Sequence, residues 1–573
     1  NGDPVDVEVE AGESLLSVLR ERLGIVSVKD GCAPQGQCGC CTVLVDGGAR
    51  VSCVTPATRV AGRHVTTIEG LDAKPRDTLV DALVATGGSQ CGFCTPGIVV
   101  RLAALLGAGK TDAVDVDRAL AAHLCRCTGW QTIVEAFALA RGGAAGATGA
   151  ATRDLDRAAR TASLGRSAQV VGPDVVRGAV GFADDTAPRD ALVAVPAPDG
   201  ADVPTTHAAG VRWVVADSLL GARALAGKVQ GRRTTRSDGQ PLAVPPVPLD
   251  GVALATGWLE PAYLELDASW CAPGGDPASA LANGGAFGGK EHGLVERAAR
   301  ELADACGRAV RVVLSREDVV RLGPKRPPIA ASACLDGEVV RVDGRFVAPA
   351  DPADRDEWLR FATTAPNPYG LALDATWEAA PVAGPPTSSA LRAAGYAETV
   401  VLLEGALDAA GVERSARELD AGARAVLLDN AVRWFDGSTV GARVEIDVAT
   451  GLLSGVSIRA VTHDEYDDVV LRSYLIGAAH MALGWVLTEA IAVDADSGEP
   501  LDLTIRSFGI IRARDMPPVD VELVQVDAPP LGSFAPVFAA VAAATWNAVT
   551  RAEADRPTTF PARNTRAARP LRR

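Results

Sequence analysis

The sequence predicts an α+β protein built from several domains, and three observations support this prediction. The chain has 573 residues, and at roughly 150 residues per domain this length suggests about four domains. Strand patterns and helix patterns occupy separate stretches of the first 141 residues, and they alternate in the remainder. Nine of the twelve cysteines lie in the first 127 residues, which distinguishes this part of the chain from the rest.

The composition is that of a globular protein, and the charge limits the kinds of partner that we expect. The formal net charge of −15 argues against a nucleic-acid backbone as the main partner. Hydrophobic residues make up 48% and charged residues 22%, as in ordinary globular proteins. The most apolar segment, 537–549, is short and interrupted by polar side chains, so we expect a buried helix and no membrane span. No export signal opens the chain, and we expect a cytoplasmic protein.

Residues 1–72 are predicted to form a small β-rich domain with one helix. Apolar and acidic residues alternate over 5–9, which is typical of a strand, and leucines repeat on one face of 13–24, which indicates a helix. An Asp-Gly turn inside 41–54 predicts a β-hairpin. The segment 64–68 adds another short strand.

Residues 73–141 carry helix signals instead and are predicted to form a small four-helix domain. The segment 98–106 is apolar nearly all round, which indicates a buried helix, and two further helices follow at 114–123 and 128–140. The segment 142–153 is rich in Gly and Ala and is the clearest linker in the chain.

The remaining residues, 154–573, are predicted to form a large mixed α/β region. Short strands such as 310–314 alternate here with helices such as 292–306. A weakly marked break divides this region into a first part, 154–425, and a second part, 426–573.

The first cysteine group has the spacing of an iron–sulfur site. Three cysteines lie in a glycine-rich loop and one follows on the neighbouring strand, and four such thiolates can hold one [2Fe–2S] cluster. The four predicted ligands are Cys32, Cys38, Cys41 and Cys53. Cys40 is adjacent to a predicted ligand and is expected to point elsewhere. A structural zinc site is the alternative, although zinc usually takes two closely spaced cysteine pairs.

The second cysteine group consists of two close pairs, each at a helix boundary. The pairs are Cys91 with Cys94 and Cys125 with Cys127. Helix N-termini favour thiolates through the helix dipole. The spacing by itself leaves zinc and an iron–sulfur cluster equally open.

Two sets of motifs resemble one known family. GCAPQGQCGCCTVLVDG, followed by SCVTPA, is similar to the β-grasp plant-type ferredoxin domain of the xanthine dehydrogenase and aldehyde oxidoreductase family of molybdenum hydroxylases. QCGFCTPGIVV, which begins at Gln90, and HLCRCTGW resemble the helical [2Fe–2S] domain of that family. The resemblance implies two [2Fe–2S] clusters and a cofactor contact for Gln90. The family spaces the first two cysteines by four residues, whereas this chain has five between them.

The segment GGAFGGKEH is a glycine-rich loop before a helix, a position that by itself could hold any anion. It resembles the family's loop beside the molybdenum centre, in a region that binds molybdopterin. The resemblance implies that Gly285, Ala286, Phe287 and Gly288 pack against the pterin and the metal ligands. Glu291 falls where purine-hydroxylating members bind substrate, and an acid in the first turn of a helix would equally explain it.

Other positions match the family pattern less well. In LRAAGYAE, Arg392 matches a family arginine that could stabilise developing negative charge, and a surface arginine is the alternative. Ala394 replaces the family phenylalanine that packs on substrate, and Met481 stands in place of a family glutamine.

The catalytic glutamate of the family has no acidic counterpart here. Ser533 and Phe534 occupy the neighbourhood where that glutamate deprotonates a metal-bound hydroxyl. A positioned general base contributes roughly 10²- to 10⁴-fold to the rate. Either the sequence omits segments of an active enzyme, or the site has lost its base.

The resemblance implies a molybdenum hydroxylase that oxidises a heteroaromatic, purine-like substrate or an aldehyde with oxygen derived from water. Electrons would pass through a molybdenum pterin, in its cytosine dinucleotide form, and through both [2Fe–2S] clusters to an external acceptor. No FAD domain is expected in this chain, so the acceptor would be a separate flavin subunit or a soluble molecule. We expect an oligomer. The alternative function is an electron-transfer or scaffold subunit with an inactive molybdenum site.

Overall fold

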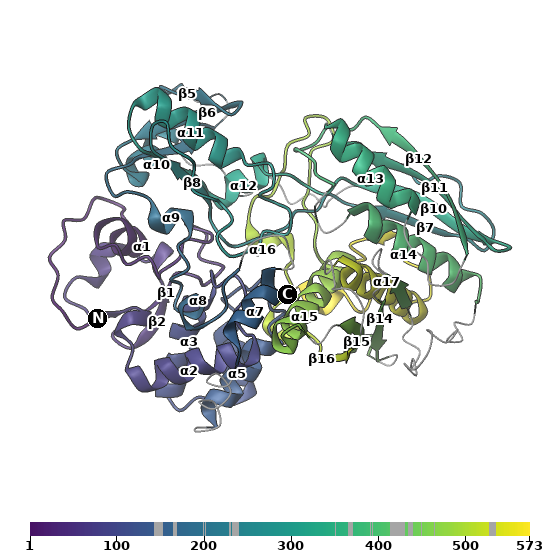
Figure 1. Ribbon diagram of the computed structural model, residues 1–573, viewed down its shortest axis with the longest axis horizontal. Coiled ribbons are helices and arrows are strands. Elements are labelled where there is room, and N and C mark those ends of the chain that lie inside the picture. The colour runs from purple at the N-terminus through teal and green to yellow at the C-terminus, as the bar shows by residue number, and fades with distance from the viewer. Residues whose placement is uncertain are drawn as a thin grey trace.

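The computed structural model in Figure 1 is a mixed α/β protein with several units. It describes the chain except for residues 143–152, 164–168, 199, 201, 228–230, 232–239, 350, 365–370, 390, 392–393, 413–429, 434–438, 448–449, 463–464, 526–534 and 573. The predicted linker therefore lies almost entirely outside the described residues, as does the predicted boundary near residue 425.

The N-terminal unit contains a three-stranded sheet in the order β2-β1-β3 and one short helical segment. The Asp-Gly turn joins β1 to β2 in register from Thr42↔Val51 to Val45↔Gly48, which confirms the predicted hairpin. The predicted strand at 5–9 is wrong, because this segment is largely exposed and pairs with no described strand. The elements are α1 (Leu15–Ser17), which continues as a π-helical turn (Val18–Arg22), β1 (Thr42–Val45), β2 (Gly48–Val51) and β3 (Val65–Thr66).

The second unit is helical, and its helices occur close to where the sequence places them. Its elements are α2 (Ala73–Thr86), α3 (Thr95–Gly107), α4 (Ala113–Leu120) and α5 (Gln131–Arg141). Its buried side chains join those of the C-terminal elements in one continuous hydrophobic core. This unit is therefore packed into the rest of the protein along a shared core.

A five-stranded sheet in the order β5-β6-β4-β9-β8 lies above the N-terminal unit in Figure 1, with α10 and α11 beside it. The elements of this third unit, and the short helices before it, are α7 (Leu155–Ala162), α8 (Pro173–Val176), α9 (Ala183–Thr186), β4 (Leu192–Pro196), β5 (Thr206–Ala208), β6 (Val211–Ala216), α10 (Leu219–Ala226), β8 (Asp267–Cys271), α11 (Leu294–Cys306), β9 (Val310–Leu314) and α12 (Arg316–Leu322).

A second five-stranded sheet has the order β12-β11-β10-β7-β17. Its last strand comes from the end of the chain and pairs in parallel with β7, so residues on both sides of the predicted boundary near 425 share one sheet. The elements are β7 (Val252–Thr256), β10 (Ile329–Asp336), β11 (Val339–Val347), α13 (Pro352–Thr364), β12 (Ala372–Ala380), α14 (Ala394–Ala409) and β17 (Thr559–Phe560).

The C-terminal elements form a sheet in the order β13-β14-β15-β16 and two long helices that pack together. Helix α15 has the length and hydropathy of a membrane span, but 83% of its most apolar window is buried inside the protein, as in the core helix of a globular fold. The elements are β13 (Asn430–Arg433), β14 (Thr439–Ile446), β15 (Leu453–Thr462), α15 (Asp468–Leu487), α16 (Ile505–Phe508), β16 (Val519–Gln525) and α17 (Ala535–Ala552).

Candidate redox and cofactor site

The four thiols of the first cysteine group are buried and form one connected run. The Cys32 thiol lies within hydrogen-bond reach of the thiols of Cys38 and Cys53, and the Cys53 thiol reaches that of Cys41. Backbone N–H groups of Gln37 and Cys38 donate to Cys32 Sγ at 3.4 and 3.3 Å, and the Cys53 N–H donates to Cys41 Sγ at 3.4 Å. N–H groups directed at sulfur are the contacts that tune iron–sulfur potentials.

Cys40 does not point away from this group, contrary to the expectation. Its thiol is buried and lies within hydrogen-bond reach of the Cys38 thiol. The cause is local, because Gly39 between them adopts a left-handed conformation with φ of 72° and curls the loop.

The second cysteine group consists of two pairs of buried thiols. Cys91 Sγ lies 3.5 Å from Cys127 Sγ, and the Cys94 thiol lies within hydrogen-bond reach of that of Cys125. Cys94 is the residue before helix α3, as expected. The neighbouring Cys94 thiol, with help from a hydrogen bond to Thr128 Oγ1, lowers the pKa of Cys125 to about 6, which favours the thiolate that binds iron.

Each group provides the four buried cysteine thiols that one [2Fe–2S] cluster requires. Among the residues that the structure describes, no three His, Cys, Asp or Glu side chains surround a common point closely enough to bind one metal ion. A [2Fe–2S] cluster instead has four cysteine ligands shared between two irons. The eight cysteines are therefore enough in number for two such clusters.

The loops that carry the two cysteine groups touch each other directly. The N–H of Leu124 donates to the carbonyl oxygen of Cys38 at 2.9 Å. Gly97, in the first turn of α3, packs so closely on the other loop that a Cβ atom there would lie 2.8 Å from the carbonyl oxygen of Cys40. The two sites are therefore linked through backbone atoms.

The glycine-rich loop lies against the second cysteine group. A Cβ atom on Gly285 would lie 2.9 Å from Cys91 Cβ and 3.2 Å from Cys127 Sγ, so only glycine allows this approach. Asn283 anchors the loop, because its Nδ2 donates to the carbonyl oxygen of Gln90 at 3.1 Å. Phe287 has a φ of 51°, a left-handed value that is uncommon for a bulky residue.

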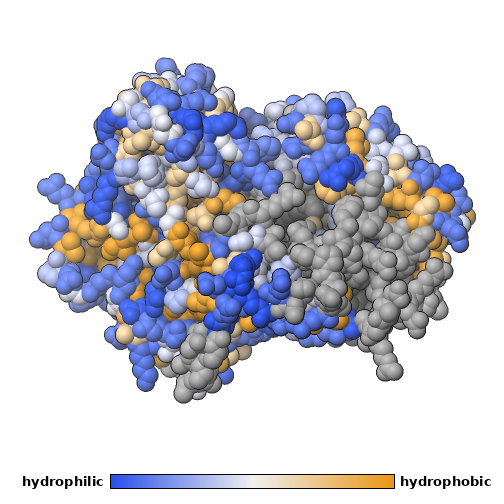
Figure 2. All heavy atoms as spheres, in the orientation of Figure 1, coloured by the Kyte–Doolittle hydropathy of each residue, from blue (hydrophilic) through white to orange (hydrophobic). Residues whose placement is uncertain are grey.

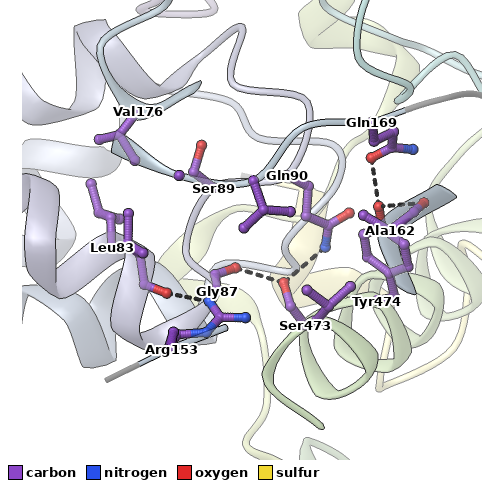
Figure 3. Close-up of a pocket in the computed structure, with 14 residues that line it drawn as sticks. Leu83, Gly87, Ser89, Gln90, Arg153, Ala162, Gln169, Val176, Ser473 and Tyr474 are labelled. Carbon is purple, nitrogen blue, oxygen red and sulfur yellow. Dashed lines mark hydrogen bonds between the residues drawn. The ribbon is translucent and has the colours of Figure 1, made fainter. Parts of the chain in front are cut away.

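Gln90 lines a cavity between the helical unit and α15, shown in Figure 3. Its Nε2 donates to the carbonyl oxygen of Cys127 at 3.0 Å and to Ser473 Oγ at 2.9 Å. The Tyr474 hydroxyl donates to Gln169 Oε1 at 2.6 Å, and burial raises the pKa of Tyr474, which keeps it protonated. The cavity is narrow, with about 20 Å³ of room for a water-sized molecule, and amide and hydroxyl groups supply part of its lining.

The structure places the remaining predicted residues as follows. Ala286 is buried, whereas Gly285, Phe287 and Gly288 are partly exposed in the same loop. Glu291 is exposed and lies outside the lining of the cavity around Gln90. Three predicted residues fall outside the described part of the chain, namely Arg392, Ser533 and Phe534.

Sequence reasoning missed several residues of this site. Met481 was singled out in α15, but it is buried in the hydrophobic core, and the same helix directs Ser473 and Tyr474 at the cavity instead. A serine and a tyrosine near the start of a mostly apolar helix were the available signal. No sequence signal pointed to Asn283 or Gln169, because the contact between their segments exists only in the folded chain.

Two family models match the N-terminal part of the chain. A "[2Fe-2S] binding domain" matches residues 67–138 and a "2Fe-2S iron-sulfur cluster binding domain" matches residues 1–63. These two ranges contain both cysteine groups.

Sequence comparison finds relatives of the same part. The chain is 42% identical to the xanthine dehydrogenase iron–sulfur-binding subunit of Escherichia coli O157:H7, over 23% of this chain and 86% of that subunit. It is 42% identical to the nicotine 6-hydroxylase small subunit of Paenarthrobacter nicotinovorans, over 24% of this chain and 82% of that subunit. It is 43% identical to the aldehyde oxidoreductase of Megalodesulfovibrio gigas, but there the match covers 24% of this chain and 15% of that protein.

The fold extends the likeness to the whole chain. The aldehyde oxidoreductase from Desulfovibrio gigas superposes with a TM-score of 0.71 at 16% identity, over 99% of this chain and 98% of that one. The aldehyde oxidoreductase from Desulfovibrio desulfuricans gives a TM-score of 0.69 at 16% identity, over 97% and 98%. With the relatives of the iron–sulfur part, these findings confirm the resemblance. The chain belongs to the xanthine dehydrogenase and aldehyde oxidoreductase family of molybdenum-dependent oxidoreductases.

Proposed function

We propose that the chain is a molybdenum hydroxylase that oxidises a heteroaromatic or aldehyde substrate and passes the electrons to an external acceptor. The observation that carries this proposal is the contact of three parts at one place. The glycine-rich loop, through Gly285, and the cavity, through Gln90, both rest on ligands of the second cysteine group. When bound, a molybdenum pterin supplies hydroxylation with water-derived oxygen, and two [2Fe–2S] clusters supply stepwise electron transfer.

The residues of the chain position these groups in series. Gln90, Gln169 and Ser473 supply amide and hydroxyl groups beside the second cysteine group, the region in which the pterin would bind. Gln90 spans from this cavity to the carbonyl oxygen of Cys127, a ligand of the second cluster. The hydrogen bond from Leu124 to Cys38 then connects the ligand loop of the second cluster to that of the first. This order supports electron flow from the cavity through the second cluster to the first.

The finer features of the proposal follow from the family resemblance. We propose the cytosine dinucleotide form of the pterin and a separate flavin subunit or soluble molecule as acceptor. Two of the relatives are named as subunits, of xanthine dehydrogenase and of nicotine 6-hydroxylase, which supports a multisubunit assembly. The preference for a purine-like substrate rests on Glu291 alone, and its exposure gives that preference no additional support. Turnover of aldehydes but not of purines would reject it.

A second candidate function is an electron-transfer or scaffold subunit without hydroxylase activity. The observation in its favour is the sequence Gly-Ser-Phe at 532–534, which has no acid where the family carries its catalytic base. Without a positioned base, turnover falls by roughly 10²- to 10⁴-fold.

Metal analysis of the purified protein separates the two functions. Both predict two [2Fe–2S] clusters and hence four irons per chain. The hydroxylase requires one molybdenum per chain as well, together with substrate-dependent reduction of the clusters. Four irons without molybdenum would overturn the hydroxylase and support the second candidate.

A pair of glutamine variants tests the role of the cavity. Gln90→Leu removes the contacts with Cys127 and Ser473, so we expect molybdenum content to fall while iron content is retained. Gln131→Leu is the matched control, because Gln131 also links the helical unit to the C-terminal region, through Val519, but lines no part of the cavity. Equal molybdenum content in both variants would contradict a cofactor site at Gln90.

A further inference from the structure

The glycine-rich loop is closed at its base by a buried lysine. Lys290 follows the glycines of the loop, and its Nζ reaches back to donate to the carbonyl oxygen of Ala280 at 2.6 Å. The same ammonium group donates to the carbonyl oxygen of Leu266, just before β8, at 3.1 Å. One side chain thus ties both ends of the segment 280–290 to the start of a strand in the third unit.

A buried carboxyl group joins the same two ends. Glu265 Oε1 lies 3.4 Å from Lys290 Nζ, and it also accepts a hydrogen bond of 3.4 Å from the N–H of Ala282. Ala280 is held a second time, because its N–H donates to Glu296 Oε1 of α11 at 3.1 Å. Lys290 and Glu265, which we call the clamp, therefore hold the loop before and after its glycines.

The clamp is buried, although both of its side chains are ionisable. Figure 2 shows hydrophilic residues over much of the face of the third unit that is turned to the viewer, and such a surface is the usual place for charged side chains. The side chains of Lys290 and Glu265 are by contrast only 2% and 3% exposed. Because the cost of removing two charges from water can exceed their attraction, a buried ion pair is weak evidence for stability and points to a role in positioning.

The loop that the clamp holds reaches the second cysteine group. The backbone of Gly285 lies so close that a Cβ atom there would be 3.2 Å from the Sγ atoms of Cys91 and Cys127. Cys127 is only 5% exposed in this packing. Solvent exposure of the sulfur atoms is one of the factors that set the potential of an iron–sulfur cluster. The position of the loop therefore bears on the second cluster.

We propose that Lys290 and Glu265 are positioning residues, which seat the glycine-rich loop on Cys91 and Cys127 and thereby set the reduction potential of the second cluster. This inference rests on that part of the proposed function in which the second cysteine group holds a [2Fe–2S] cluster, and it does not require molybdenum. Loss of the clamp lets the loop move and water reach the sulfur atoms. Water stabilises the reduced cluster, because the reduced state carries one more negative charge.

The main variant is the double substitution Lys290→Met with Glu265→Gln, in the full chain with its clusters. It replaces both partners by neutral side chains at once, so it leaves no unpaired buried charge and does not change the net charge of the site. Burial raises the pKa of Glu265 to about 7, so the measurements are made at pH 8, where the carboxyl group is ionised. A redox titration followed by electron paramagnetic resonance measures the ratio of reduced to oxidised cluster at a fixed potential.

The double variant should keep the iron content of the unaltered protein. At a fixed potential, the ratio of reduced to oxidised second cluster should rise about tenfold, which is roughly 59 mV for a one-electron couple. The resonance signal of the second cluster should change as well, whereas the first cluster should titrate as before. An unchanged ratio and signal in a stable double variant would overturn the inference, because a role in stability alone predicts that result.

Lys325→Met is the matched control. Lys325 is buried too, and its Nζ also donates to two carbonyl oxygens, those of Val319 and Gly323, but these lie in and just after α12 and not in the loop. This variant should leave the ratio of reduced to oxidised second cluster unchanged. The same shift in the control as in the double variant would reject a specific role for the clamp.

A pair of single variants decides the matter if the double variant loses its second cluster. Glu265→Gln and Asp267→Asn each remove one buried carboxyl group from the same segment. Glu265 contacts the loop through Ala282, whereas Asp267 accepts a hydrogen bond from the Tyr263 hydroxyl at 3.0 Å. Glu265→Gln should shift the ratio more than Asp267→Asn does, and equal shifts would contradict the inference.

The two proposals fail in different ways. Dithionite reduces the clusters without molybdenum, so the titration does not depend on hydroxylase activity. A shifted ratio in the double variant of a protein that lacks molybdenum retains the clamp and loses the hydroxylase. Substrate turnover by the unaltered protein, with no shift in the double variant, retains the proposed function and removes this role of the clamp.

Discussion

The two cysteine groups are held by the chain in different ways. The first takes three of its four cysteines from one loop, 32–41, and the N–H groups that contact its sulfurs come from the same loop or from Cys53. The second is enclosed by distant segments as well, since Gly285 and Gly477 both pack against Cys127. A local sequence is thus enough to shape the first site, whereas the second depends on how the large region docks. Four variants probe this difference.

The largest effect is expected where α15 meets the second group. A methyl group on Gly477 would collide with the carbonyl oxygen of Cys127. Because a backbone atom cannot move aside as a flexible side chain can, Gly477→Ala should lower the free energy of unfolding by more than about 3 kcal/mol. We expect loss of the second cluster alone, measured as iron per chain and by electron paramagnetic resonance. Gly107→Ala, in open space at the end of α3, is the control and should retain both clusters.

The next effect concerns the buried ion pair beside the second group. Arg126 lies between the ligands Cys125 and Cys127 and binds Glu489 through two hydrogen bonds of 2.5 and 2.7 Å. Removal of one partner leaves a buried charge, so Glu489→Gln should lower the stability by about 3–5 kcal/mol.

A more exposed pair provides the control for this variant. Glu135 and Arg472 also join the helical unit to α15, but their side chains are about a third exposed. Glu135→Gln should therefore lower the free energy of unfolding by less than about 1 kcal/mol. Chemical denaturation followed by the cluster absorbance compares the two. Similar losses would show that docking at Arg126 has no special importance.

A third effect depends on pH. Burial, with a smaller contribution from the charge of Arg126, lowers the pKa of His480 from 6.5 to about 4. The unfolded chain therefore binds the proton first, and stability falls as the pH decreases from about 6.5 towards 4. His480→Gln should remove up to about 3 kcal/mol of this loss.

The check is the apparent melting temperature at pH 7 and pH 5. The variant should lose less stability between these two values than the unaltered protein. His207→Gln serves as control, because His207 is exposed on β5 whereas His480 is buried in α15. An identical pH dependence in all three proteins would refute the argument.

The smallest effect is expected in the first group. Gly36 has a φ of 67°, and a Cβ atom there would lie 2.9 Å from Val54 Cγ1. Gly36→Ala should therefore lower the free energy of unfolding by about 1–2 kcal/mol. We expect a changed resonance signal for the first cluster and an unchanged second cluster. Gly47→Ala imposes the same backbone strain in an open turn, so it should alter neither signal.

Sequence patterns predicted the N-terminal third of the fold better than the remainder. The hairpin at 41–54 followed from its Asp-Gly turn, because turn chemistry is local. The strand at 5–9 failed because alternation alone does not supply a neighbouring strand. The pairing of β17 with β7 joins residues about 300 positions apart, and no local pattern encodes such a contact.

The sequence by itself indicated the family through its motifs, and with that resemblance it predicted eight cysteine ligands, because motifs and their spacing are read along the chain. It also indicated the glycine-rich loop, since that loop needs residues without a Cβ atom. Only the tertiary structure decided that Ser473 and Tyr474, not Met481, face the cavity, and that Cys40 turns towards Cys38. Those outcomes depend on which distant backbones approach one another, and that approach is set by packing across the whole core.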